Sequence, residues 1–448
     1  MRKRYTLRCY VTGAAAARTG DEMSGPALLL AGLAVTGSAS TATALLAGIT
    51  VSAAVGGPVF GVLLDRSARP GRLLAVALGA YGAALVVILL SLGRVPLVAT
   101  VLVAVCAGLL GPALSGGWTA QLPCVVGRKD LPRATALDAM TFNFASLTGP
   151  ALAGTAAGLA GAPIGVIVSV GLIGAAVPVA WRLPGVRGGE PGEVPALAPD
   201  SDPAPAPALT TDSAPAQVPA QVPAPVQTSS PRPAPTSVVV DLRAGFRAIL
   251  RTPSLARATV ASVISCVGQG ILVACSPLLG ERAFGSANHG VLLLSGVAAS
   301  ALVANAVLSR YPGLMRPDAV VPCSTTVLAV ALLLAATGRP VLLVTAMLIA
   351  GLGEGPQLAA LFAIRHREAP ERSRGQVFTT GASLKLTGFA LGVALTAPLA
   401  ARSLTTALLT AAATQAVATL AFVRRSRRSR SGRRSHRSYR SRSGRSGC

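Results

Sequence analysis

The stretch Gly61-Val-Leu-Leu-Asp65-Arg66-Ser-Ala-Arg69-Pro-Gly-Arg72 decides the fold class, because it sets a short charged segment between two long apolar runs. Three arginines and one aspartate cannot lie in hydrocarbon, so this segment is a turn outside a bilayer. The runs on either side are then helices that leave the membrane on the same side. An Asp-Arg pair in a basic loop also fits a simple positive-inside anchor, so the rest of the chain has to distinguish the two interpretations.

The composition agrees with a membrane protein. The 448 residues have a mean hydropathy of +0.60 and are 52% hydrophobic and only 12% charged, yet the formal net charge is +24. This combination indicates apolar spans joined by basic loops. The seven cysteines show no Cys-x2-Cys or Cys/His spacing, so we expect neither a metal site nor a disulfide framework. No Gly-x4-Gly-Lys-Ser/Thr motif for ATP is present, and we expect no enzyme and no cofactor.

Apolar runs long enough to cross a hydrocarbon core of roughly 30 Å recur along the chain, and in lipid they must be helices. We expect twelve spans, at residues 9–35, 40–64, 72–92, 96–121, 134–159, 162–181, 256–279, 288–309, 319–337, 340–364, 375–400 and 404–423. The fold class is therefore an all-α integral membrane protein.

Basic residues gather in alternate loops. With the N-terminus inside, the inner loops hold Arg66, Arg69, Arg72, Arg128, Lys129, Arg133, Arg310, Arg316, Arg365, Arg367, Arg372 and Arg374. The outer loops hold only Arg94, Arg282, Arg339 and Arg402. This asymmetry predicts an even number of helices in a cell membrane, with both termini in the cytoplasm.

Two segments between the sixth and seventh spans differ from the rest. Residues 183–240 are rich in proline and alanine. Such a segment buries too little apolar surface to fold, so we expect it to be a disordered cytoplasmic linker. It would join two helical bundles, at residues 1–182 and 258–423. Residues 241–257 place Leu242, Phe246 and Ile249 opposite Arg243 and Arg247, which predicts an amphipathic helix on the inner membrane surface.

The two halves repeat each other weakly, at a shift of about 240 residues. The segment from Gly108 to Leu114 recurs from Gly351 to Leu358, and Leu147-Thr-Gly149 recurs as Leu386-Thr-Gly388. Asp65-Arg66 has a degraded counterpart in Ser309-Arg310. Several matches in the same order favour a duplicated bundle of six plus six helices.

The loop at Gly61, Asp65, Arg66 and Arg69 resembles the loop signature of the major facilitator superfamily, Gly-x3-Asp-Arg-x-Gly-Arg-Arg/Lys, with Ala68 and Pro70 as departures. Arg18-Thr-Gly-Asp21, Leu131-Pro-Arg-Ala134 and Gly149-Pro150 with Gly154 are similar to bacterial drug-efflux members. The resemblance covers essentially the full chain and implies a secondary transporter, with the Asp65 loop as a gate and the fifth helix carrying a partial antiporter motif.

Charges inside the spans are the candidate site residues, because a charge at mid-membrane costs at least about 2.5 to 3.5 kcal/mol. Arg18, Asp21 and Glu22 stand at i, i+3 and i+4 on one helix face, so we expect the arginine to neutralise one carboxylate locally. The second carboxylate is then available to couple a proton. An alternative is that these charges only hold helices in register.

Glu354 and Lys385 form a second set. Each lies eleven residues from a loop arginine, or about 16 Å at 1.5 Å per residue, so we expect an ion pair at mid-membrane. Asn143 and Gln269 are further polar candidates for the cavity. Asp138, five residues after Arg133, is interpreted as a capping residue near the helix start.

The function predicted from these features is proton-coupled efflux of a small, lipophilic molecule by a monomer in contact with membrane lipids. An uptake permease and a non-transporting membrane scaffold of the same fold remain alternatives. The segment 424–448 contains eleven arginines and is expected to contact anionic lipid; binding of nucleic acid is the less favoured interpretation.

Overall fold

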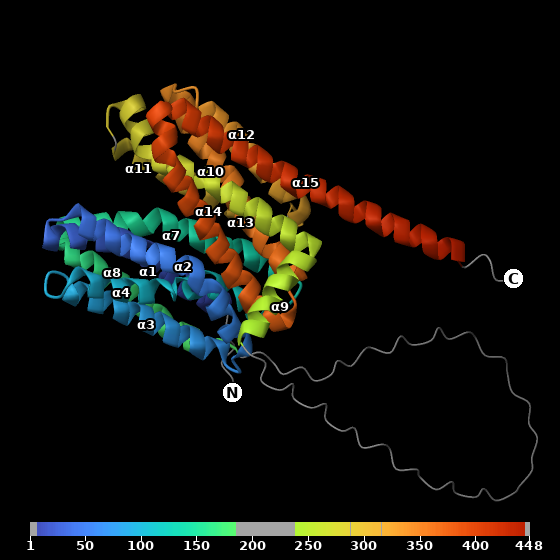
Figure 1. Ribbon diagram of the computed structural model, residues 1–448, viewed down its shortest axis with the longest axis horizontal. Coiled ribbons are helices and arrows are strands. Elements are labelled where there is room, and N and C mark those ends of the chain that lie inside the picture. The colour runs from blue at the N-terminus through green and yellow to red at the C-terminus, as the bar shows by residue number, and fades with distance from the viewer. Residues whose placement is uncertain (1–6, 185–237, 287, 315, 444–448) are drawn as a thin grey trace, which may run out of the picture. The chain divides into compact units, whose positions relative to one another are not determined.

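The computed structural model describes residues 7–184, 238–286, 288–314 and 316–443, all of them helical or in short connections (Figure 1). The first bundle contains α1 (Leu7–Thr36), α2 (Ala39–Arg66), α3 (Pro70–Ser91), α4 (Leu97–Gly108), the π-helical turn η1 (Ala113–Gly117), α5 (Trp118–Ala120), α6 (Leu122–Val125), α7 (Leu131–Ala160) and α8 (Ala162–Trp181). The region from α4 to α5 forms one long segment, Leu97–Ala120.

The second bundle follows the short helix α9 (Val238–Arg251). It contains α10 (Pro253–Phe284), α11 (Asn288–Arg310), the 3-10 turn η2 (Pro312–Leu314), α12 (Pro317–Ala335), α13 (Pro340–Glu368), the 3-10 turn η3 (Glu371–Ser373), α14 (Arg374–Arg402) and α15 (Leu404–Ser443). Proline stands in the first turn of α3, α7, α8, α10, α12 and α13, where its missing N–H leaves no helical bond unmade.

The twelve predicted spans are confirmed as long helical segments, with ends that differ by a few residues except in α15, whose helix continues twenty residues past residue 423 to Ser443. Among the described helices, ten segments are long and apolar enough to cross a membrane. The other two long helices are α1 and α7, which carry Arg18, Asp21, Glu22 and Asp138 in their interiors. Their lower hydropathy comes from the polar groups that form the site described below.

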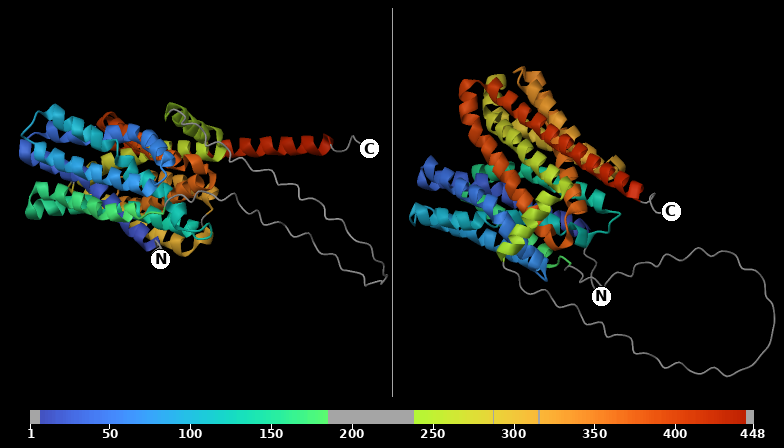
Figure 2. Two further views of the ribbon diagram at one scale, coloured as in Figure 1. Left: turned by 90° about the horizontal axis from the view of Figure 1, so that it is seen from below. Right: turned by 45° about the vertical axis from the view of Figure 1, so that its right-hand side comes forward.

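Two predicted boundaries were wrong. The amphipathic helix ends at Arg251, and Arg257 belongs instead to α10, which begins at Pro253. α13 continues past residue 364 to Glu368, so Arg365 lies within a helix and not in a loop. Most of the predicted linker, residues 185–237, falls outside the described residues. The backbone of α15 is helical to Ser443; its first part packs on α10 and α12, and Figure 2 shows its C-terminal part running clear of the other helices.

The two bundles meet along α2 against α14 and α7 against α11. Glycines make the first contact close: a Cβ on Gly57 would lie 2.3 Å from the carbonyl oxygen of Thr379, and one on Gly61 would lie 2.4 Å from Cα of Gln376. Any side chain at these positions would push α14 away. The glycine of the Asp65 loop signature therefore serves helix packing between the bundles.

Candidate functional site

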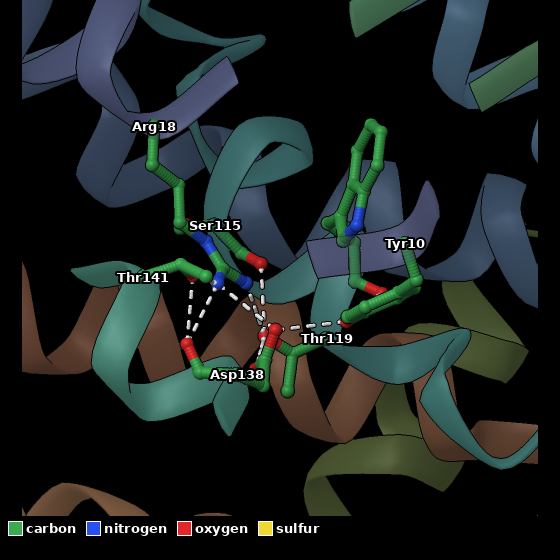
Figure 3. A network of polar contacts seen from close by, with 7 residues as sticks. Tyr10, Arg18, Ser115, Thr119, Asp138 and Thr141 are labelled. Carbon is green, nitrogen blue, oxygen red and sulfur yellow. Dashed lines mark hydrogen bonds and ion pairs between the residues drawn. The ribbon is translucent and has the colours of Figure 1, made fainter. Parts of the chain in front are cut away.

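A buried polar network joins α1, α5 and α7 (Figure 3). Nη1 of Arg18 donates to Oδ1 of Asp138 at 2.9 Å, and the two side chains are 2% and 0% exposed. Thr119 accepts from Nη2 of Arg18 at 2.8 Å and donates to Oδ2 of Asp138 at 2.9 Å. The Tyr10 hydroxyl donates to Oδ1 of Asp138 at 2.9 Å, and Thr141 also bonds Arg18. The carboxylate thus has partners on both oxygens.

This network corrects two predictions. Arg18 does not pair with Asp21 or Glu22 on its own helix, because its side chain reaches across to α7. Asp138 is not a cap near the membrane surface, since it lies inside α7 and is fully buried. The network satisfies both carboxylate oxygens of Asp138 and both terminal nitrogens of Arg18, while Nε of Arg18 has no partner in the described structure. Removing either charged partner leaves the other charge without compensation.

Asp21 and Glu22 form no ion pair with Arg18, although Arg18 still acts on Asp21 electrostatically. The Asp21 carboxyl is half-buried and within hydrogen-bonding reach of the Tyr81 hydroxyl on α3. Glu22 is exposed and packs on the α7 side of α1, where a Cβ on Gly149 would lie 2.8 Å from Cβ of Glu22. Among the described residues neither carboxylate belongs to an ion pair. Two acidic groups without a bound cation therefore lie side by side in a membrane-spanning helix.

A cleft of about 610 Å³ opens next to this position. It is lined mainly by alanine, leucine and phenylalanine side chains, with Thr19 of α1 one helical turn before Glu22. The lining residues are Ala15, Ala16, Thr19, Phe144, Leu147, Thr148, Ala151, Leu152, Thr155, Leu172 and Ser295, from α1, α7, α8 and α11. The cleft combines an apolar wall with a few hydroxyls.

The predicted helix-five motif contributes to packing at one of its positions. Gly149 allows α7 to approach the backbone of Glu22 and Met23 closely, and Pro150 follows it inside the helix. Gly154 has open space where a Cβ would stand. Asn143 is buried, and its amide nitrogen has no hydrogen-bond partner within the described part of the chain.

The second bundle contains its own polar chain. Gln269 of α10 donates to Gln357 of α13 at 3.3 Å, and Gln357 donates to the Ser265 hydroxyl at 2.9 Å. Glu354 and Lys385 interact electrostatically, but they form no ion pair in the described structure, so the predicted contact was wrong. The helices that carry the two residues do not pack closely on each other, because α10, and not α13, is the main neighbour of α14 within this bundle.

Asp65 connects the two bundles. Its Oδ1 accepts from the backbone amide of Gly375 at 2.6 Å, and its Oδ2 accepts from that of Gln376 at 2.8 Å. Both amides belong to the first turn of α14, where the helix dipole favours a negative charge. Two turns further along α14, the Ser383 hydroxyl donates to the carbonyl oxygen of Ala53 at 2.7 Å. These polar contacts close one end of the seam, here called the Asp65 end.

The amphipathic helix α9 covers this contact. Arg66 pairs with Asp241 at 2.6 Å, and the Gln376 side chain donates to the carbonyl oxygen of Leu242 at 3.0 Å. Arg69 is exposed, and its backbone amide bonds the Ser67 hydroxyl. The loop signature, α9 and the start of α14 therefore form one connected cluster.

The chain forms two six-helix bundles that contact each other through hydrogen bonds and contain buried charges. This arrangement is typical of a membrane transport protein. The sequence profile of the Major Facilitator Superfamily matches residues 10–317. The chain belongs to this superfamily and is a multi-pass secondary transporter, not an enzyme. No curated protein sequence matches the chain significantly.

Solved structures agree on the fold over nearly the whole chain. A bacterial homologue of the iron transporter ferroportin, in an outward-facing state, aligns with a TM-score of 0.68 at 15% identity, covering 94% of this chain and 99% of that one. The human organic anion transporter MFSD10 gives 0.69 at 14%, with 94% and 100% covered. The E. coli fucose:proton symporter FucP gives 0.65 at 12%, with 94% and 99% covered. At these identities the likeness shows the fold alone.

The Asp65 contact leads to a testable prediction. Asp65→Asn keeps the size of the side chain but removes the charge that faces the α14 dipole, which is worth about 0.3 to 2 kcal/mol. We expect the closed seam to be disfavoured by about 2- to 30-fold and turnover to slow, while the protein still reaches the membrane. Initial transport rates per inserted molecule measure the effect, and Asp65→Glu is the charge-retaining control. Equal rates for Asp65→Asn and the parent protein would reduce the loop to a topology anchor.

Proposed function

We propose that this protein exports a small lipophilic molecule in exchange for protons by alternating access, with the Asp65 end and both termini in the cytoplasm. The observation that carries the proposal is the pair Asp21 and Glu22, left without a bound cation because Arg18 is committed to Asp138. A carboxyl group in a membrane-spanning helix that is not held by a cation can take up and release a proton.

The proton step follows from the place of the two acids. Glu22 and Asp21 repel each other, so a proton held on one of them relieves that repulsion. A cavity open to the more acidic exterior would load the proton. A cavity open to the cytoplasm would release it and accept the substrate instead. The polar contacts of Asp65 and Ser383 are the bonds that break and reform between these states.

The substrate class and direction rest on two further observations. The cleft beside Thr19 has a mostly apolar lining, which suits a lipophilic molecule. The loop at the Asp65 end carries Arg66 and Arg69, and a basic loop favours the cytoplasmic side. Uptake in the opposite direction uses the same parts and is the second candidate.

Inverted membrane vesicles test the proposal. With an imposed pH gradient, acidic inside, vesicles that contain the protein should accumulate members of a panel of lipophilic dyes, and a protonophore should release them. Vesicles without the protein are the control. A gradient that drives no compound, while purified protein exchanges labelled for unlabelled dye, would contradict proton coupling. Absence of any exchange would favour a scaffold that has kept the fold.

A further inference from the structure

Arg365 of α13 is a buried cation without a counter-ion. The residue is 1% exposed, and its Nε and Nη2 atoms have no hydrogen-bond partner in the described structure. None of the ion pairs among the described residues includes it. Arg18, the other deeply buried arginine, has the Asp138 carboxylate. The second bundle therefore keeps one charge that its own residues do not neutralise.

The space around Arg365 is shaped for the guanidinium. Gly381 of α14 faces it, and a Cβ there would lie 2.3 Å from Nη2 and 2.4 Å from Cζ, so a side chain at this position would displace the guanidinium from its present place. The Phe378 ring lies 5.9 Å from Cζ of Arg365, and the Cys266 thiol of α10 faces the same space. His366 stacks on Phe378 with ring centroids 4.5 Å apart.

The charged groups nearby do not supply the missing anion. Lys385, one turn beyond Gly381 on α14, is itself cationic and interacts with Glu354. Arg374, at the start of α14, is close enough to His366 to interact with it electrostatically. Arg374 is itself paired with Glu371. No carboxylate among the described residues pairs with Arg365, and an isolated buried charge costs several kcal/mol unless it is paired.

The unpartnered edge of the guanidinium indicates what would bind. Nε and Nη2 carry parallel N–H groups that lie in the guanidinium plane along one edge. Two such N–H groups match two oxygens of a carboxylate, sulfonate or phosphate. We propose that Arg365 binds an anionic group of the transported molecule, which rests on the transport function proposed above and makes the substrate a lipophilic anion.

The position of Arg365 couples this binding to the seam. Phe362 of α13 contacts Phe142 of α7 with ring centroids 5.5 Å apart, and Phe378 lies 5.9 Å from Phe362. A Cβ on Gly116 of η1 would lie 2.6 Å from the Phe378 carbonyl oxygen. Separation of the bundles at the Asp65 end uncovers these rings and the arginine beneath them.

Closing the seam over an empty site buries the bare arginine, whereas closing it over a bound anion buries a neutral pair. A ligand shifts such an equilibrium by its difference in affinity between the two states. The anionic substrate therefore permits closure of the Asp65 end, and the empty transporter is held open. This selects against cycling without cargo.

Hydrogen exchange tests the effect on closure without any substrate. In substrate-free nanodiscs, Arg365→Gln removes the charge and should slow exchange of the amides from Gly375 to Gly381 by about tenfold or more, because closure is no longer opposed. Arg365→Lys keeps a charge and should resemble the parent protein. Arg257→Gln, at an arginine that faces Asp318 and Phe422 away from the seam, is the matched control and should not slow exchange. Equal exchange in Arg365→Gln and the parent protein would overturn the proposal.

Transport of matched compounds tests the chemistry. The compounds are 2-naphthoate, 2-naphthalenesulfonate, the methyl ester of 2-naphthoate and 2-naphthylmethylammonium, in the inverted-vesicle assay. Only the two anions should be transported. Arg365→Gln should transport them at least tenfold more slowly than the parent protein does. Transport of the ammonium compound that is unchanged in Arg365→Gln would overturn the anion site. If the pH gradient moves none of the compounds, the proposed function is at fault, and the exchange comparison still decides the role of Arg365.

Discussion

Replacing Asp138 with alanine is expected to destabilise the protein by about 3 to 5 kcal/mol, because it leaves the buried Arg18 guanidinium without its carboxylate. The same change removes the acceptor of the Tyr10 hydroxyl and of Thr119. Unfolding of purified protein in mixed micelles with rising dodecyl sulfate measures the loss. Asp138→Asn keeps one acceptor oxygen but replaces the other with a donor nitrogen and removes the charge, so we expect an effect smaller than that of alanine but not zero.

The double variant Arg18→Met with Asp138→Leu is the control for this prediction. It removes both charges together, so it should recover a large part of the stability lost in Asp138→Ala. A double variant as unstable as Asp138→Ala would mean that packing of the two helices, and not the uncompensated charge, explains the loss. Full stability of Asp138→Ala itself would contradict the importance of the network.

The helices were predictable from sequence because hydropathy and charge report depth in the membrane. The spans and the loop position of Asp65 needed only apolar length, loop charge and the loop signature. Depth, however, does not give the rotation of a helix about its axis. Arg18 could therefore be placed in α1 with two carboxylates one turn away, while its true partner on α7 was hidden.

Asp138 also shows that sequence does not give the direction in which a helix turns its side chains. Its distance from Arg133 in sequence fits a cap, yet α7 starts at Leu131 and Asp138 is turned toward α1 and α5. The predicted contact between Glu354 and Lys385 was wrong for the same reason, since it rested on depth alone.

Arg365 was missed because it begins a basic run, Arg365-His366-Arg367, that reads as an inner loop. The positive-inside rule counts the basic residues of a loop and gives no information on which of them point into the protein interior. The spacing along α13 could have indicated its place. Arg365 stands seven residues after Leu358 and eleven after Glu354, and α13 continues for three more residues to Glu368, so Arg365 still belongs to the helix. A loop count cannot detect this.

The largest functional effect is expected from Asp21→Asn combined with Glu22→Gln. Each pH unit is worth about 1.4 kcal/mol per proton exchanged, so a gradient of one unit supports up to about a tenfold substrate ratio for one-to-one exchange. The double variant has no acid left on α1 to carry the proton. We expect its ratio to fall to about one, while exchange of labelled for unlabelled substrate continues, because the cleft and the Asp65 seam are unchanged.

The single variants identify the coupling group. The one that carries the proton should abolish accumulation alone, and the other should leave the tenfold ratio largely intact. Glu22 packs on the α7 side next to the cleft, whereas Asp21 is close to Tyr81, so we expect Glu22→Gln to have the larger effect. Glu354→Gln is the matched control, since it removes a carboxylate from the second bundle that already has Lys385 nearby. If the double variant on α1 still accumulates substrate tenfold, the proton is carried elsewhere. Glu354 with Lys385 is then the next pair to test, because Glu354 lies well inside α13 and interacts electrostatically with Lys385 of α14.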